Sequence, residues 1–263
     1  MFLMANIFVA ILALGLSVFI TNKMIDVIDS IGRKFSRSPD IAKLKEQRDL
    51  KQLLGALHHH NAATRRQAVE ALGNLGDRQA TTALAVAYTD DDSSVRLAAQ
   101  EALTKLGASP IETLVTSFEQ KDVDVRLRLA AATALGKLDD PRAIDALTVA
   151  LADNNIDVRH RATMVLASLK DPRVVDALSV ALTDKEWIVA VTAATELAKF
   201  GERAVEPLIT ALKHTEGAVR LAAVQSLGNI GDVRAVDALT AALKDDDNDV
   251  RQEAKAALKH LGV

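Results

Sequence analysis

The sequence predicts an all-α protein, namely an α-solenoid of about seven two-helix repeats that follows one N-terminal transmembrane helix. The solenoid is predicted by a pattern of about 31 residues that recurs seven times between residues 48 and 261, and by the helical spacing of its apolar positions. The transmembrane helix is predicted by an apolar N-terminus that has no charge before Lys23. A fixed repeat of this length is typical of a solenoid rather than of a globule with one central core.

Three columns of small and apolar residues define the repeat. The second half of each unit carries a leucine, namely Leu72, Leu103, Leu135, Leu166, Leu197, Leu227 and Leu258. An alanine stands four residues earlier, namely Ala68, Ala99, Ala131, Ala162, Ala193, Ala223 and Ala254. The first half carries its own leucine, namely Leu53, Leu84, Leu114, Leu147, Leu178, Leu208 and Leu239. We expect the alanine column to let neighbouring helices approach closely.

Each half of a unit is predicted to be an amphipathic helix of about three turns. In residues 95–106 the apolar positions step by four, four and three, and the first halves repeat this spacing, as in residues 142–151. Glycine ends five of the second halves, as at Gly76, where a left-handed residue is easiest for glycine. Seven units therefore predict fourteen helices, which are too short to be stable singly and must stack.

Asp- and Asn-rich turns stand between the two halves of each unit, as in residues 90–92 and 245–247. We expect these side chains to cap the second helix by accepting its free amides. Calcium binding is the alternative, but the twelve-residue loop with its glycine and terminal glutamate is missing from the sequence.

With these turns, the chain resembles the HEAT family of helical repeats, in particular the short HEAT-like units of phycobilin lyases and of prokaryotic scaffold proteins. The carrying residues are the acidic turn, the Ala-Leu-Gly-x-Leu-Gly-Asp run of residues 71–77, and the pairs Val95-Arg96, Val158-Arg159, Val219-Arg220 and Val250-Arg251. The resemblance implies an α-solenoid in which this arginine reaches an acidic turn of the neighbouring unit. It implies no single activity, because such arrays serve many functions.

The N-terminal segment divides the expected organisation into a transmembrane helix at residues 1–22, a juxtamembrane amphipathic helix or linker at 23–46, and the solenoid at 47–263. Residues 2–20, of which only Asn6 and Ser17 are polar, nearly match a hydrocarbon layer of roughly 30 Å as a helix. The predicted membrane-contacting residues are Phe2, Leu3, Ile7, Phe8, Ile11, Leu12, Leu14, Leu16, Val18, Phe19 and Ile20. Basic residues follow the segment, which predicts an outside N-terminus and a cytoplasmic solenoid. The alternative is a helix buried in a partner subunit.

An apolar stripe at helical spacing continues beyond the predicted membrane helix, at Met24, Ile25, Ile28, Ile31 and Phe35. This stripe is compatible with a helix in the lipid interface, with contact to another protein, or with a solvated linker.

Charge argues against nucleic acid as a partner. Residues 1–46 hold six Lys or Arg against four Asp or Glu, whereas the remaining residues hold 26 against 31. Phosphate neutralisation needs a surplus of basic residues, and one Trp with one Tyr offers little surface for stacking bases.

No catalytic constellation is predicted. The triplet His58-His59-His60 lies in one turn, where adjacent rings converge poorly on a metal, and His160, His214 and His260 are isolated. The chain has no His-Glu dipeptide, which the di-iron hydroxylase of the HEAT family requires. We therefore expect no catalytic residue, no metal and no cofactor.

Candidate partner-binding residues lie around a break in the arginine column, where Ala190 replaces arginine and Trp187 stands just before it. Trp187 is interpreted either as an anchor for a partner or as a filler of the space that the arginine leaves. One position after the arginine column lies a second candidate row, namely Arg66, Leu97, Leu129, His160, Val191 and Leu221, with Gln252 at its end. This row either faces a partner on the concave surface or belongs to the core.

These observations predict a non-catalytic, membrane-anchored scaffold or assembly factor for a membrane-associated complex. The expected partners are another, membrane-associated protein and, through the N-terminal helix, the lipid bilayer; nucleic acid is not expected and the oligomeric state stays open. The alternative is a lyase-type HEAT-repeat enzyme or chaperone that acts on tetrapyrrole-carrying proteins, as the resemblance to phycobilin lyases implies.

Overall fold

The structure is a computed structural model that describes residues 38–120, 123–138 and 140–263, and all regular elements within these ranges are helices. A short helix, α2 (Ile41–Glu46), precedes seven helix pairs. The pairs are α3 (Leu50–Ala56) with α4 (Ala62–Leu75), α5 (Thr81–Ala87) with α6 (Ser93–Lys105), α7 (Pro110–Thr116) with α8 (Val125–Lys137), α9 (Arg142–Ala150) with α10 (Ile156–Ser168), α11 (Val174–Ala181) with α12 (Trp187–Leu197), α13 (Val205–Ala211) with α14 (Gly217–Ile230), and α15 (Val236–Ala242) with α16 (Asn248–His260). Short 3-10 helices lead into three of the first helices, namely η1 (Arg78–Ala80), η2 (Ala198–Ala204) and η3 (Val233–Ala235).

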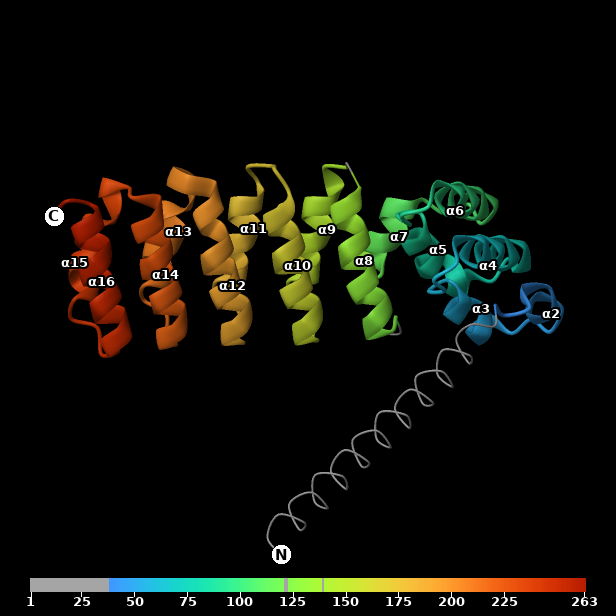
Figure 1. Cartoon of the computed structure of the whole chain (residues 1–263), viewed down its shortest axis with the longest axis horizontal. Coiled ribbons are helices and arrows are strands. Elements are labelled where there is room, and N and C mark those ends of the chain that lie inside the picture. The colour runs from blue at the N-terminus through green and yellow to red at the C-terminus, as the bar shows by residue number, and fades with distance from the viewer. Residues whose placement is uncertain (1–37, 121–122, 139) are drawn as a thin grey trace, which may run out of the picture.

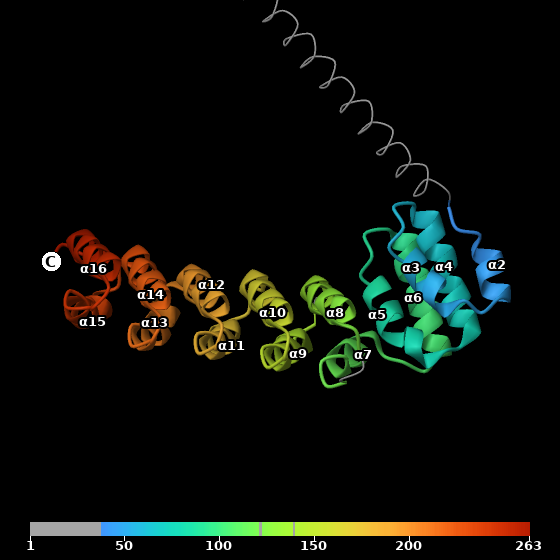
Figure 2. The same ribbon diagram turned by 90° about the horizontal axis from the view of Figure 1, so that it is seen from below.

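The pairs, numbered repeats 1 to 7, stack into two layers. In Figure 1 the second helices α8 to α16 form one row and the first helices α7 to α15 form a parallel row behind it; Figure 2 shows the two rows side by side. Along this row each second helix contacts the next one. The fourteen predicted helices and the all-α solenoid are therefore confirmed.

The core is a continuous layer between the two rows of helices. All fourteen leucines of the two predicted columns are at most 7% exposed, and every member of the alanine column is fully buried. Small residues outside this column also let second helices pack closely: a Cβ atom added to Gly73 of α4 would lie 2.6 Å from Cβ of Ala102 in α6. Burial of each leucine contributes roughly 1.5–3 kcal/mol to folding.

The helix ends follow the local sequence. The side chains of Asn61, Asp92, Asp124, Asn155 and Asp247 cap five of the second helices by accepting backbone amides of the first turn. Glu186 and Glu216 stand at the same position in repeats 5 and 6 without a side-chain cap bond. Gly76 and Gly231 end α4 and α14 at φ of 70° and 71°, a conformation that a residue with a Cβ atom adopts at a cost.

The row of second helices is interrupted between α6 and α8. Among the described residues α4 stacks on α6, whereas α8 packs against the first helix α5 and shares no stacked interface with α6. Repeats 1 and 2 consequently run across the direction of repeats 3 to 7 (Figures 1 and 2). Lys137 of α8 bridges the junction, with Nζ 2.9 Å from Oδ1 of Asp91 in the turn before α6. The solenoid thus has a first block, repeats 1 and 2, and a second block, repeats 3 to 7.

The predicted membrane localisation requires a correction. In the part of the chain that the structure describes, no helix has the length and apolar character that a membrane crossing requires. The physical reason is that the helices are amphipathic and short: the longest, α4 and α14, have 14 residues, whereas a span takes about 20. The prediction of a single-pass membrane protein with an outside N-terminus and a cytoplasmic solenoid is therefore not upheld. Its predicted helix at residues 1–22 and the stripe at 24–35 lie outside the described residues.

Candidate functional site

A ladder of Arg–Asp ion pairs joins neighbouring repeats. In each rung an arginine near the start of a second helix donates from Nε and Nη2 to both carboxylate oxygens of an aspartate 25 residues later, in the turn of the next repeat. The rungs are Arg65–Asp90, Arg128–Asp153, Arg159–Asp184 and Arg220–Asp245, with donor–acceptor distances of 2.7 to 3.1 Å. The ladder that the family resemblance implied is present at these four junctions.

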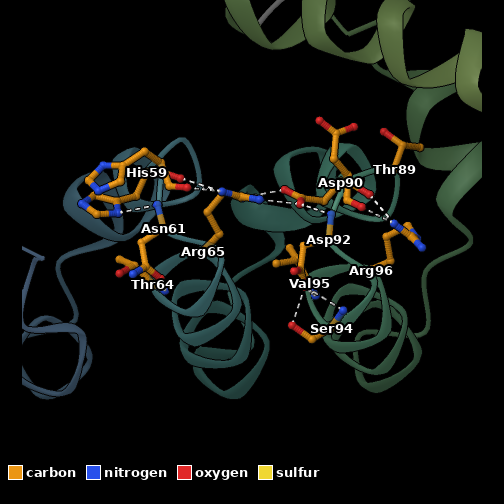
Figure 3. Close-up of polar contacts among 12 residues, drawn as sticks. His59, Asn61, Thr64, Arg65, Thr89, Asp90, Asp92, Ser94, Val95 and Arg96 are labelled. Carbon is orange, nitrogen blue, oxygen red and sulfur yellow. Dashed lines mark hydrogen bonds and ion pairs between the residues drawn. The ribbon is translucent and has the colours of Figure 1, made fainter.

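Each rung also organises the two turns that it connects (Figure 3). Arg65 Nη1 donates to the carbonyl oxygen of His59 in its own repeat at 2.8 Å. In the next repeat, Asp90 Oδ1 accepts the N–H of Asp92 at 2.9 Å, and Asp92 accepts the N–H of Ser94 at 2.9 Å to cap α6. The acidic turns therefore act in capping and in the ladder, as the capping prediction required.

In two rungs, hydrogen bonding shifts a pKa in the direction that favours the charged form. Hydrogen bonds from the Arg220 guanidinium hold the pKa of Asp245 at about 2, against an ordinary value of 3.8. The hydrogen bond to Asp184 likewise raises the pKa of Arg159 above its ordinary value, which outweighs the opposing effect of burial. Groups that keep their charge near neutral pH are suited to holding structure rather than to proton transfer.

One rung is missing between repeats 5 and 6, and both of its members are replaced. Ala190, fully buried, stands where the arginine would be, and His214 stands where the aspartate would be. His214 keeps the turn function of the aspartate, because its Nδ1 accepts the N–H of Glu216 at 3.0 Å, as Asp184 Oδ1 accepts the N–H of Glu186 at 2.9 Å. The joint replacement leaves no buried charge without its partner at this junction.

The predicted partner-binding row lies along the second helices, close to the seam between each second helix and the next. Leu129, Val191 and Leu221 are half-buried and contact the core. His160 is half-buried, with Nε2 3.1 Å from Oγ1 of Thr192 on the following second helix. These members share a place in the fold, and contact with a partner stays a prediction.

Two members of the row are more exposed than the rest. Leu97 on α6 is 58% exposed, because α8 does not stack on α6 and leaves this side chain uncovered. Arg66 on α4 is also exposed, and its Nη1 lies 3.7 Å from Oε1 of Glu70 on the same helix.

Trp187 begins α12 and is 51% exposed. The residues at the same position of α8 and α10, Val125 and Ile156, are half-buried and pack against the core, whereas Trp187 is more exposed. Half of the indole surface lies in solvent, and contact of Trp187 with a partner stays a prediction.

The second helices α12 and α14 present a face without charged side chains, which sequence analysis did not identify. This neutral face consists of the exposed or half-buried residues Trp187, Ile188, Val191, Thr192, Thr195, Ala218, Leu221 and Gln225. The two helices contain only two charged residues, of which Glu196 is half-buried and Arg220 is buried in the ladder. Met164 of α10, 50% exposed, adjoins the same layer. The sequence alone could have indicated this face, because α4, α6, α8, α10 and α16 carry charged residues at positions where α12 and α14 have none.

The histidine triplet takes part in a turn. His59 Nδ1 accepts the N–H of Asn61 at 3.1 Å, and the rings of His59 and His60 lie 4.2 Å apart. His59 Nε2 is buried and has no hydrogen-bond partner. Across the described residues, no three His, Asp or Glu side chains gather in a way that would hold a metal ion.

These features define an α-solenoid protein of short helix pairs that are joined by a ladder of ion pairs. The sequence pattern of HEAT repeats matches residues 40–104, 111–187 and 175–259. The chain belongs to the HEAT-repeat family, as its resemblance indicated.

Individual proteins with similar sequences or structures include two of the phycocyanin system. The chain is 24% identical over 216 residues to the uncharacterized phycocyanin operon protein Z of Pseudanabaena tenuis (strain PCC 7409), a match that covers 78% of this chain and 91% of that protein. The complex of CpcE and CpcF of phycocyanin lyase from Nostoc sp. PCC7120 is 25% identical, with coverage of 56% of this chain and 97% of that chain and a TM-score of 0.42. Human deoxyhypusine hydroxylase in complex with glycerol is 19% identical, with coverage of 92% and 98% and a TM-score of 0.42.

Proposed function

We propose that this protein is a non-catalytic scaffold that holds a partner protein on the neutral face of its second helices. The observation that supports this function is the exposed Trp187 on the neutral face of α12 and α14, next to the exposed Met164 of α10. The centres of protein interfaces are depleted of charged residues and enriched in aromatic residues and methionine. Tryptophan is also the residue type most often found to dominate binding energy.

The dimensions of the neutral face favour a helix or an extended segment of the partner. Neighbouring second helices lie roughly 8–10 Å apart, so the surface from α10 to α14 extends over about 20 Å. This length corresponds to about four turns of an α-helix, whose apolar side would lie across α10, α12 and α14. Ladder rungs lie on either side of this surface: Arg159–Asp184 joins repeat 4 to repeat 5, and Arg220–Asp245 joins repeat 6 to repeat 7.

Site-specific photo-crosslinking in the native cell tests the proposal. A photoreactive amino acid at Trp187 or Met164 is expected to capture one partner protein. The matched controls are Val180 and Val149, which are 55% and 42% exposed but lie on the first helices α11 and α9. Equal capture from all four positions, or capture only from the first helices, would contradict a partner on the second-helix layer.

A second candidate function is a lyase-type enzyme or chaperone that acts on tetrapyrrole-carrying proteins. It is supported by the similarity to a phycocyanin operon protein over 91% of that protein's length. The test is to mix the purified protein with apo-phycocyanin and a free bilin and to record the absorbance spectrum. A covalent bilin adduct that forms only with this protein present would favour the lyase. An unchanged spectrum, together with partner capture from the neutral face, would favour the scaffold.

A further inference from the structure

We infer that the junction between repeats 2 and 3 is a hinge about which the first block, repeats 1 and 2, turns relative to the second block, repeats 3 to 7. This inference does not depend on the proposed function. It rests on the residues that α6 presents to the next repeat, on the contacts that cross the junction, and on the clefts beside it.

The first observation is a column of buried residues that is interrupted at α6. The column lies three residues before the second-helix leucine, on the side of the helix toward the next repeat. Five of its members are fully buried, namely Val69, Ala132, Thr163, Ala194 and Val224. In α6 this position is Gln100, which is exposed, and in the last second helix, α16, it is Lys255, which is also exposed. At this position α6 therefore has the polar residue that suits the last helix of an array.

The second observation concerns the position one residue after the same leucine, where second helices approach most closely. A Cβ atom on Gly73 would lie 2.6 Å from Ala102, and one on Gly228 would lie 2.9 Å from Ala257, each on the following second helix. The equivalent residue of α6 is Thr104, which is exposed. Because α6 carries larger, polar residues at both positions, α8 has no surface on α6 against which to stack closely.

The third observation concerns the contacts that cross the junction, which are mainly those of α5 and one exposed ion pair. The first helix α5 touches both α7 and α8, and it thereby forms the pivot. The Lys137–Asp91 ion pair is well exposed, at 48% and 92% for the two side chains, and exposed pairs contribute little to stability.

The fourth observation is that clefts open on two sides of the pivot. One of about 650 Å³ lies between α6 and the end of α8 and is lined by Tyr88, Leu97 and Lys137. The other, of about 290 Å³, lies between α5 and α8 and is lined by Val86 and Leu127. Both clefts open to solvent, so water borders the contact between α5 and α8 on two sides. A contact between solvent-exposed elements opens at a lower free-energy cost than one in a core.

Rotation about this pivot carries α8 between its place on α5 and a place beside α6. The displacement is about one helix spacing, roughly 8–10 Å. As the blocks turn, the 650 Å³ cleft between α6 and α8 widens or narrows, and Leu97 is uncovered or covered. The second helices of the two blocks thus form two surfaces, and the angle between these surfaces changes as the blocks turn.

Distance measurements between spin labels test the hinge. The chain has no cysteine, so two introduced cysteines carry the only labels. The pair Glu70→Cys and Met164→Cys spans three repeats across the junction, from α4 to α10. The matched control, Met164→Cys and Ala256→Cys, spans three repeats within the second block, from α10 to α16, and uses the same repeat position. We expect a narrow distribution for the control pair, and a broad or two-peaked distribution, with peaks about 8–10 Å apart, for the junction pair.

A second variant ties the motion to α6. Gln100→Val with Thr104→Gly gives α6 the residues that α4 has at Val69 and Gly73, and it is expected to narrow the junction distribution by letting α8 stack on α6. The control, Lys255→Val with Lys259→Gly in α16, is expected to leave that distribution unchanged, with helix content checked by circular dichroism. A junction distribution as narrow as that of the control pair would overturn the hinge. So would a broad distribution that the Gln100 and Thr104 substitutions leave unaltered.

Discussion

Arg159 and Asp184 form the most buried rung of the ladder, with their side chains 5% and 6% exposed. Arg159 Nε lies 2.7 Å from Oδ2 of Asp184 and Nη2 lies 3.0 Å from Oδ1, so the guanidinium and the carboxylate meet in a two-fold hydrogen-bonded pair. This pair links the second helix of repeat 4 to the turn of repeat 5. Because stability in a solenoid is a sum of repeat and neighbour terms, such rungs set how strongly adjacent repeats unfold together.

Replacement of Arg159 by alanine should destabilise the protein strongly, by about 3 kcal/mol, because it leaves Asp184 buried without its countercharge. The control is Arg251→Ala at the same position of the last repeat, where the guanidinium donates to the carbonyl oxygens of Asp245 and Asp246. Loss of those bonds is expected to cost about 1 kcal/mol. Urea unfolding followed by circular dichroism measures both. Equal losses would show that the rung adds nothing beyond its bonds within one repeat.

Restoring the missing rung should reveal coupling between positions 190 and 214. Ala190→Arg alone places a charge at a fully buried position opposite a histidine and is expected to destabilise by about 2 kcal/mol. His214→Asp alone is expected to destabilise by about 1 kcal/mol or more, because it preserves the turn bond to Glu216 but places a carboxylate opposite Ala190 without an arginine. In the double variant the two substitutions should be less destabilising than their sum by about 1–3 kcal/mol. A double-mutant cycle of unfolding free energies measures this term, and strict additivity would contradict the proposed origin of the gap.

Acid should weaken the junction between repeats 6 and 7 through Asp245. Its pKa is about 2 in the folded protein against 3.8 ordinarily, so it binds protons more readily when unfolded. The stabilisation from this group is therefore complete above pH 4 and is lost as the pH falls toward 2. Asp245→Asn removes the titrating carboxylate, so its unfolding free energy should fall less steeply over this interval. Thermal melts of both proteins between pH 5 and pH 2 test this, and parallel curves would contradict it.

The sequence predicts repeat-internal features well because nearest neighbours determine them. The leucine column around Leu103 and the cap at Asp92 each depend on residues within about ten positions, and both appear as predicted. The angle between the two blocks depends instead on how α8 packs on α5, which no periodicity encodes. Two features of the sequence nevertheless mark this junction. Gln100 is polar in a column whose members are buried in five other repeats, and Leu114 and Leu135 of repeat 3 are 21 residues apart, whereas Leu53 and Leu72 of repeat 1 are 19 apart.

The candidate site was predicted only in part. Trp187 and the row that includes Val191 were selected as single positions, whereas the structure shows that they share a surface with Thr195 and Gln225. The neutral face is defined by the absence of charged side chains from one side of α12 and α14, so a search for chemically active residues does not detect it. The ladder break at Ala190 was visible, but its partner at His214 becomes meaningful only when the 25-residue pairing is known.

Trp187→Ala should separate binding from packing. Because half of the indole is already exposed, its truncation should change the unfolding free energy by about 1 kcal/mol or less. If the ring is an anchor of the neutral face, affinity for the partner captured by crosslinking should fall by about 30-fold or more, which corresponds to about 2 kcal/mol. Val180→Ala on α11, at similar exposure, should alter neither quantity greatly. Calorimetric titration and urea unfolding of the same preparations measure the two effects, and a large loss of stability with unchanged affinity would assign Trp187 to packing between repeats 5 and 6.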